Sequence, residues 1–458
     1  MQSRRDQVQA QSYVHSRVIS ALVNGDPETL DHPHRPTITG TLSGFLLAAL
    51  IVTGFGVYGF FRPGGATSWQ QPGALVVEKN TGSRYVYVDG LLRPVVNYAS
   101  ARLLLGDSAK VVSASTKSLA SAAHGQPIGI IGAPDSLPAD GDAAAQEWTI
   151  CALAGRDRVG LVQTFTTVAV GQASSGRTIG PDEAIAVSVG KEQFLLWHGH
   201  RLRLGASWMA RILGAGDVVP VRENWLRTVP AGPDLRTPDP GERGKPGPAI
   251  DGRSRRSGEL FVVHSGTGPD RNFLLRPDGL QPLTPIQYAL AVADPATAAL
   301  YGGGDVRPAE LSLAELARLP TVAAPDPGGD LPEQVPRMLD HPQNGSGWCL
   351  RQPMSGGSAE IIADESASAA DTVRGNPAID NTDRTANAVA VAPGLGGLYA
   401  AGRFGQGAGA MLFLITDTGV KYPVVSTDAA ERLGYYAQPG PCPPELLDLL
   451  PTGPSLGP

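Results

Sequence analysis

The three cysteines are the residues of this sequence whose chemistry is easiest to constrain. They are Cys151, Cys349 and Cys442, and none belongs to a C-x-x-C pair or lies near a histidine in the sequence. This spacing argues against a zinc or redox centre, because both need clustered thiolates or imidazoles. An odd number leaves one thiol free or paired with another chain. In an exported domain, the oxidising surroundings would favour a disulfide.

Two histidines are the candidate metal ligands. His198 and His200 are spaced so that both side chains could project from one face. No third ligand lies nearby in the sequence, and a solvated turn is the simpler interpretation. The segment His32-Pro33-His34 is interpreted as a linker before the membrane, and the run Arg253–Arg256 as a solvated loop. We therefore predict no metal site.

A nucleotide site is the next chemistry to consider. A P-loop needs G-x-x-x-x-G-K-[ST], because its amides cradle phosphate and its hydroxyl holds magnesium. The two G-K pairs, Gly190-Lys191 and Gly244-Lys245, lack both the following hydroxyl and the earlier glycine. The glycine-rich run 394–409 contains no lysine and is interpreted as loops and strand turns. G-x-S-x-G is also absent. We predict no catalytic and no cofactor-binding residues.

The composition favours short strands and turns. The chain has 458 residues, with 37 basic and 43 acidic side chains, and this mildly acidic balance argues against a nucleic-acid binder. It contains 57 glycines and 40 prolines, and only 17% of its residues are charged. So many backbone breakers indicate strands, turns and long loops rather than a helical bundle.

The strongest physical signal is the uncharged run Ile38–Phe61. Its 24 residues would make a helix of roughly 36 Å, enough to span a hydrocarbon core of about 30 Å. Arg35-Pro36 and Arg62-Pro63 flank it and are expected to end the helix on both sides. A cleaved signal peptide would start nearer the N-terminus, and a buried core helix is the other alternative. The sequence predicts one transmembrane helix.

The residues before the span are predicted to be cytoplasmic. Basic residues there outnumber those just after it, which favours an N-terminus inside the cell and a large exported domain. Val14, Val18 and Leu22 recur every four residues and predict a short amphipathic helix that ends near Asn24-Gly25. The basic residues compared are Arg4, Arg5, Arg17 and Arg35 against Arg62 and Lys79.

Glycines within the span form two patterns. Gly40 and Gly44 make a G-x-x-x-G pair, which permits close packing of transmembrane helices. Ordinary glycine usage in membrane helices is the alternative. Gly54, Gly56 and Gly59 match the dinucleotide fingerprint, but they lie inside an apolar span rather than after a strand, so the match carries no function.

Four segments of the exported region share a pattern of an apolar run, a glycine turn, a second run and a helix. Their irregular spacing excludes a regular solenoid and suggests repeats around a separate central region. The predicted turns are Asp89-Gly90, His198-Gly199, Pro277-Asp278-Gly279 and Asp417-Thr418-Gly419. The first predicted helix is Tyr98–Leu105, with Gly106 as its stop, and the second is capped by Ser207 and ends near Leu213-Gly214. The third is capped by Thr284, with Pro285 as its first residue. The fourth is capped by Ser426 or Thr427 and ends at Leu433-Gly434.

Two of the cysteines lie between these repeats. Cys151 and Cys349 each have a tryptophan nearby, Trp148 and Trp348. A bridge between them would close a very long loop and could stabilise the domain by on the order of 4 kcal/mol in the chain-entropy model. The residues alone do not fix this pairing.

The predicted fold class is α+β, with a single N-terminal transmembrane helix and an exported domain of four β-hairpin/helix repeats around a central, mainly-β core. The predicted divisions follow the chain. They are a cytoplasmic segment (1–37), the transmembrane helix (38–61), repeat 1 (62–110), a first core segment (111–180), repeat 2 (181–230), a linker loop (231–257), repeat 3 (258–318), a second core segment with loops (319–392), repeat 4 (393–440) and a proline-rich C-terminal tail (441–458).

Several motifs together resemble EccB, the single-span membrane component of the type VII (ESX) secretion system. The similarity extends over essentially the whole chain. It is carried by the hairpin region 73–106 after the span, IGIIGAPDSLP at 128–138, WTIC at 148–151, PGLGGL at 393–398 and LLPTGP at 449–454.

The resemblance implies four repeat domains around a core with quasi-two-fold symmetry, and a core disulfide transferable to Cys151 and Cys349. Cys442 does not belong to that pattern. The resemblance also implies a single-pass protein of the cell membrane with an extracytoplasmic main domain. The implied partners are an EccC-like FtsK/SpoIIIE ATPase, EccD-like and EccE-like membrane subunits, a mycosin protease and further EccB copies.

Three functions compete at this point. The leading prediction is a structural scaffold of the secretion complex, which exports small WxG-type proteins. EccB proteins are described as ATPases, so ATP hydrolysis is the second, although no nucleotide motif supports it here. A membrane-anchored cell-wall binding protein is the third. It would need an aromatic platform in each repeat, yet Leu275 and Leu414 stand where Tyr87 and Trp197 stand in the other two.

Overall fold

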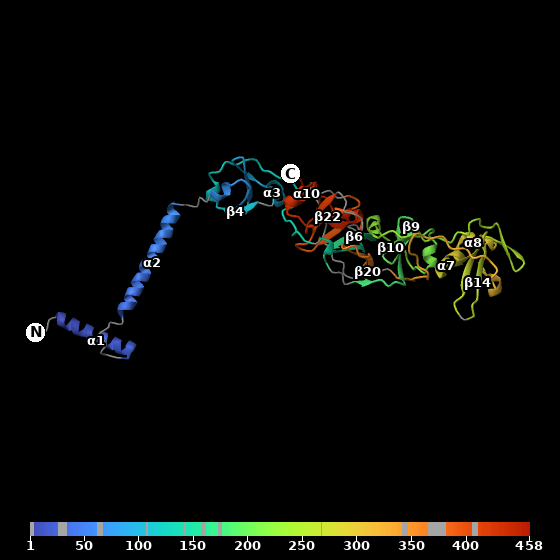
Figure 1. Cartoon of the computed structure of the whole chain (residues 1–458), viewed down its shortest axis with the longest axis horizontal. Coiled ribbons are helices and arrows are strands. Elements are labelled where there is room, and N and C mark those ends of the chain that lie inside the picture. The colour runs from blue at the N-terminus through green and yellow to red at the C-terminus, as the bar shows by residue number, and fades with distance from the viewer. Residues whose placement is uncertain are drawn as a thin grey trace. The chain divides into compact units, whose positions relative to one another are not determined.

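The structure is a computed structural model, and Figure 1 labels some of its helices and strands. The residues it describes are 4–25, 34–61, 67–106, 109–141, 143–156, 162–172, 176–266, 268–340, 347–364, 382–404 and 411–458. By its internal contacts the chain divides into two compact units. The N-terminal unit comprises residues 1–93 and 110–125, and the main unit comprises residues 94–109 and 126–458.

Two helices open the chain. Helix α1 (Arg4–Asn24) ends where the sequence predicted, and Gly25 follows it with φ 69°. Helix α2 (His34–Phe61) is one continuous helix (Figure 1). Its stretch Ile38–Gly59 is long and apolar enough to cross a membrane, and none of that stretch is buried against the protein.

The prediction that Arg35-Pro36 ends the apolar helix on its N-terminal side is wrong. Helix α2 begins at His34 and therefore includes Arg35 and Pro36. Proline fits the first turn of a helix because the amide it lacks has no partner there anyway. Arg62-Pro63, expected to end the helix on the other side, and most of the linker His32-Pro33-His34 lie outside the described residues.

The N-terminal unit holds a four-stranded sheet of order β3-β2-β1-β4. Its first three strands form an antiparallel meander, and β4 pairs in parallel with β1. Asp89 and Gly90 both have positive φ, 54° and 75°, as a two-residue hairpin of type I′ requires. The elements are η1 (Thr67–Gln70), β1 (Ala74–Glu78), β2 (Arg84–Val88), β3 (Leu91–Pro94), β4 (Lys110–Ala114) and α4 (Thr116–Leu119).

Three sheets of the main unit repeat this connectivity. In each, three strands form an antiparallel meander, and a short fourth strand pairs in parallel with the first. The first sheet also accepts β18 (Arg337–Met338) beside β8. The strands are β8 (Glu183–Val189), β9 (Glu192–Trp197), β10 (His200–Arg203) and β11 (Val219–Pro220); β14 (Leu260–Val263), β15 (Arg271–Arg276), β16 (Gly279–Leu283) and β17 (Ala309–Glu310); and β22 (Gly397–Ala401), β23 (Leu412–Ile415), β24 (Lys421–Val424) and β25 (Gly440–Cys442).

A helix follows the third strand of each sheet, as predicted. The caps at Thr284 and Ser426 and the stop at Gly106 are confirmed. The cap at Ser207 is wrong, because the helix begins one residue later than that cap requires, with Trp208 as N-cap and no side-chain bond to its amides. The helices are α3 (Tyr98–Leu105), α5 (Met209–Ile212), α7 (Pro285–Ala293) with α8 (Pro295–Leu300), and α10 (Thr427–Leu433).

A six-stranded sheet of order β21-β6-β5-β19-β20-β7 forms the centre of the main unit. Its strands contribute Trp148, Ile150 and Val168 to the largest cluster of buried side chains, together with Trp225 of α6. The central elements are η2 (Ala143–Ala145), β5 (Glu147–Arg156), β6 (Val162–Val170), β7 (Arg177–Thr178), β19 (Gly347–Pro353), β20 (Glu360–Asp364) and β21 (Ala388–Val391).

The segment 231–257, predicted as a linker loop, contains a hairpin. Strand β12 (Pro246–Ile250) pairs with β13 (Arg253–Arg256) through a turn at Asp251-Gly252. The arginine run predicted as a loop is therefore a strand, although its side chains are mostly exposed.

Each four-stranded sheet ends in a return segment that the sequence did not predict. After a second short helix, the chain comes back to pair with the third strand. In the main unit a proline carbonyl begins each return. Pro230, Pro320 and Pro451 accept from the amides of Arg201, Leu280 and Lys421 at 2.8, 2.8 and 2.9 Å. The helices are α6 (Glu223–Thr228), α9 (Leu313–Leu316) and α11 (Pro444–Leu447), with α4 in the N-terminal unit.

The last residues of the chain are packed rather than a free tail. Leu449 and Leu456 are fully buried, and Thr452 and Leu456 pair with β24. The Lys421 ammonium, itself buried, donates to the carbonyls of Leu447 and Leu450 at 2.5 and 3.1 Å. The C-terminal segment thus belongs to the last sheet.

The capping box of α7 gives a test of this local structure. Thr284 accepts from the Gln287 amide at 3.3 Å, and the Gln287 side chain accepts from the Thr284 amide at 3.1 Å. Thr284→Ala should weaken the helix by about 1 kcal/mol and speed amide exchange in α7 by about fivefold. Hydrogen exchange of the full chain measures this, and Thr284→Ser, which keeps the hydroxyl, should stay close to wild type. Equal exchange in Thr284→Ala and wild type would contradict the capping role.

Candidate functional site

The cysteines of the central sheet face each other across its two middle strands. Cys151 of β5 pairs in register with Cys349 of β19, and their sulfurs form a disulfide over a sequence separation of 198. Both side chains are buried. The third thiol, Cys442, is also buried, and burial raises its pKa. A protonated thiol of this kind is unreactive.

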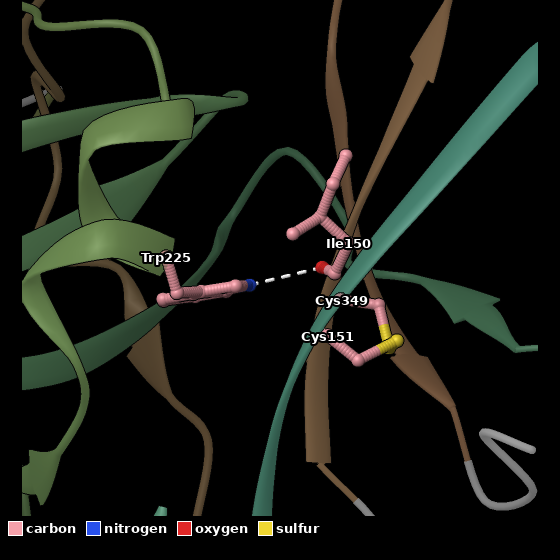
Figure 2. The surroundings of a disulfide bond; sticks show 4 residues. All are labelled: Ile150, Cys151, Trp225 and Cys349. Carbon is pink, nitrogen blue, oxygen red and sulfur yellow. Dashed lines mark hydrogen bonds between the residues drawn. A yellow bond between two sulfur atoms is a disulfide. The ribbon is translucent and has the colours of Figure 1, made fainter. Parts of the chain in front are cut away.

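The opposite face of β5 is held by a tryptophan. Figure 2 shows the disulfide and Trp225 on opposite sides of this strand. The indole Nε1 of Trp225 donates to the Ile150 carbonyl at 2.9 Å, and neither side chain is exposed. Strand β5 is therefore fixed on one face by a covalent bond and on the other by α6.

A buried polar network connects the same helix to the edge of the sheet. The Asn224 side chain accepts from the Thr166 hydroxyl at 2.7 Å and donates to the carbonyls of Arg384 and Thr385, both at 3.2 Å. The Asn387 side chain accepts from the Thr166 amide at 2.9 Å. Buried polar groups satisfied in this way specify one arrangement of the core. Its members lie far apart in the sequence, so no local sequence pattern predicted the network.

A cavity of about 560 Å³ lies beside the central sheet. Its described lining comes from three parts of the chain: Ala139, Gly141 and residues 145–147, residues 171–172, and residues 394–396. Glu147 is the one charged side chain of its described lining, which includes no lysine or arginine. The cavity thus combines a small apolar surface with a single carboxylate.

Glycines allow the walls of this cavity to close. Gly396 has φ 116°, and a Cβ there would collide with the Ile415 carbonyl oxygen. Gln146 fixes the same loop by donating to the Gly396 carbonyl at 2.5 Å and accepting from the Tyr399 hydroxyl at 3.1 Å. The glycine-rich run therefore contributes a wall at 394–396 and then enters β22. Residues 405–410 lie outside the described residues of the chain.

The two histidines considered as metal ligands lie at a hairpin turn. His198 has φ 48° and stacks on Trp197 with ring centroids 3.7 Å apart, and the His200 ring contacts the His198 carbonyl at 2.9 Å. Among the residues that the structure describes, no group of three side chains could hold a metal ion. Gly40 and Gly44 lie on the open surface of α2.

A third histidine, His264, lies close to two acidic side chains. His264 Nδ1 lies 2.9 Å from Asp270 Oδ1, and Nε2 lies 4.0 Å from Glu310 Oε1. The hydrogen bond and charge of Asp270, with a smaller effect of Glu310, raise the pKa of His264. Its partners come from β17 and from the segment before β15, so no local pattern in the sequence pointed to them.

Comparison with known proteins identifies a family. The family model described as "Type VII secretion system ESX-1, transport TM domain B" matches residues 1–458. A relative named "ESX-3 secretion system ATPase EccB3" from Mycolicibacterium smegmatis is 26% identical, over 99% of this chain and 89% of its own. A second, "ESX-5 secretion system ATPase EccB5" from Mycobacterium tuberculosis, is 25% identical over 99% and 92%.

Solved structures share the fold. One described as "Structure of an intact ESX-5 inner membrane complex, Composite C3 model" matches with a TM-score of 0.67 and 23% identity, over 100% of this chain and 94% of that one. Another, "Structure of EccB3 dimer from the ESX-3 core complex", matches with a TM-score of 0.63 and 23% identity, over 84% and 98%.

Removing the disulfide should destabilise the main unit. Replacing Cys151 and Cys349 together by alanine should lower the free energy of unfolding by about 2–5 kcal/mol, because the unfolded chain regains the freedom that the long loop had lost. Urea unfolding of the full chain in detergent, followed by tryptophan fluorescence, measures this. Cys442→Ala is the matched control, since it removes a buried cysteine side chain but no disulfide. A double variant no less stable than this control would show that the bridge adds nothing.

The surroundings of His264 predict a pH dependence. Its pKa is raised in the folded state, so the pair with Asp270 stabilises below the unfolded pKa of about 6.5, and this contribution is lost as pH rises through the folded pKa. His264→Gln should therefore reduce stability at about pH 5.5 and have little effect at about pH 8.5. Thermal unfolding of both proteins at the two pH values measures the difference. An equal effect at both would contradict the pairing.

Proposed function

Because the chain belongs to the EccB family of the type VII (ESX) secretion system, we propose that it is a structural subunit of an inner membrane complex that exports small WxG-type proteins. The observation that carries this proposal is the family match over the whole chain, from the segment before the apolar helix to the packed C-terminus. A scaffold subunit needs strands and helices that are held in fixed positions. The disulfide and the Trp225 hydrogen bond supply this to the main unit.

The exported region is proposed to consist of four copies of one repeat around the central sheet. What supports this is the shared strand order of the four-stranded sheets and their common return segments. Each copy would run from a meander through a helix to a parallel fourth strand, a second helix and the return. The first copy would draw its sheet from the N-terminal unit, and its helix α3 packs against α10 in the main unit.

The membrane arrangement follows from the apolar helix. Helix α2 is proposed to span the cell membrane once, with α1 in the cytoplasm and the sheets outside it. The excess of basic residues before the span supports this orientation. In an oxidising compartment the Cys151–Cys349 bond would persist.

The proposed partners are the other subunits of such a complex. They are an EccC-like FtsK/SpoIIIE ATPase, EccD-like and EccE-like membrane subunits, a mycosin protease and further copies of this chain. One solved structure with this fold is described as an intact inner membrane complex and another as a dimer. These descriptions support assembly with other chains as the working state.

ATP hydrolysis is the second candidate function. The names of the relatives favour it, since both matches above are called ATPases. The cavity of the main unit does not favour nucleotide binding, because its described lining contains one acidic residue and no lysine or arginine to pair with phosphate. Phosphoryl transfer depends on cations that neutralise the phosphate oxygens.

Affinity purification tests the scaffold proposal. The tagged full chain, gently solubilised from membranes, should recover an FtsK/SpoIIIE-like ATPase and multispanning subunits, as identified by mass spectrometry. The purified chain alone should show no magnesium-dependent ATP hydrolysis above a heat-denatured control. Recovery of a lone monomer that hydrolyses ATP would overturn the proposal and support the enzyme.

A further inference from the structure

We propose that the cavity beside the central sheet binds the arginine or lysine side chain of an extended peptide segment, with Glu147 as the counter-charge. The three walls come from different regions of the main unit. Glu147 is the first residue of β5, residues 171–172 follow β6, and 394–396 lead into β22. A ligand in the cavity therefore touches the central sheet and the last four-stranded sheet together.

The charge of the cavity selects a cation. Glu147 is half-buried, and none of the residues that the structure describes forms a hydrogen bond or ion pair with its carboxylate. Nearby, Asp140 accepts from the amides of Tyr436 and Ala437 at 2.9 and 3.1 Å and adds a second negative charge next to the wall at 139–141. A carboxylate without a partner attracts ammonium or guanidinium groups and repels phosphate and carboxylate.

The remaining lining fits the stem of such a side chain. Ala139, Ala145 and Leu395 supply apolar surface, and Gln172 can hydrogen-bond to a peptide group. Arginine and lysine bury their methylenes on apolar surface while the head group pairs with a carboxylate. The volume of about 560 Å³ lies within the usual range of ligand cavities, roughly 300–1,000 Å³, and leaves room for backbone on either side of the side chain.

The walls are fixed before any ligand arrives. The Gly171 amide donates to the Glu147 carbonyl at 2.9 Å, and the Leu395 amide donates to the Ala392 carbonyl at 2.9 Å. Gln146 ties the first wall to the third through the Gly396 carbonyl. A preformed site loses little entropy on binding, so even a short peptide should bind measurably.

Fluorescence polarisation with a defined probe tests this inference on the detergent-solubilised full chain. The probe is a fluorescein-labelled Gly-Arg-Gly-Gly amide, and its matched control is the same peptide with citrulline, which keeps the shape but lacks the charge. We expect saturable binding of the arginine peptide, at least tenfold weaker binding of the citrulline peptide, and weaker binding of the arginine peptide at high salt.

Variants assign the binding to this cavity. Glu147→Gln should weaken binding of the arginine peptide at least tenfold, whereas Glu431→Gln, an exposed glutamate of α10, should not change it. Ala145→Trp, which keeps the carboxylate and fills the cavity from an exposed position, should also abolish binding. Tryptophan fluorescence and disulfide content check that each variant folds. No saturable binding, equal binding of the two peptides, or unchanged affinity in both cavity variants would overturn the inference.

Discussion

The pairing of β5 with β19 is the constraint on which the main unit depends. It joins segments that are 198 residues apart at their cysteines, and closing so long a loop is entropically unfavourable. The two strands therefore form only when many contacts form with them. The disulfide fixes their register at one point, and the indole of Trp225 fixes β5 from the other face. The remaining strands of the central sheet add outward from this pair.

The four-stranded sheets must each protect two open strand edges. An open strand edge exposes unpaired backbone groups that can recruit other chains. In the main unit each fourth strand is only two or three residues long, and Pro220 and Pro441 interrupt two of them. The other edge is covered by the return segment, whose proline carbonyl accepts the first bond. The second short helix of each sheet makes this return possible, because it reverses the chain close to the third strand.

Local chemistry was predictable, and long-range pairing was not. The turn at Asp89-Gly90, the cap at Thr284 and the stop at Gly434 are encoded within four or five residues, so the sequence identified them. The return segments pair with the third strands through isolated bridges between residues that lie far apart in the sequence. For that reason the packed C-terminus was predicted only as a proline-rich tail. The cavity could not be predicted from the sequence either. Its walls come from three segments that lie far apart in the sequence, and Glu147 is one of 43 acidic residues without a motif around it.

The position of Glu147 connects the cavity to the central constraint. It is the first residue of β5, the strand held by the disulfide and by Trp225, so its backbone belongs to a strand that is fixed on both faces. The facing wall is fixed independently, because Gly396 lies too close to the Ile415 carbonyl for any other residue and is bound by Gln146. A charged group held between two fixed walls is positioned by folding, so binding does not have to order it. A cation that enters meets a carboxylate already in position, and this is why a site with a single charge can still be selective.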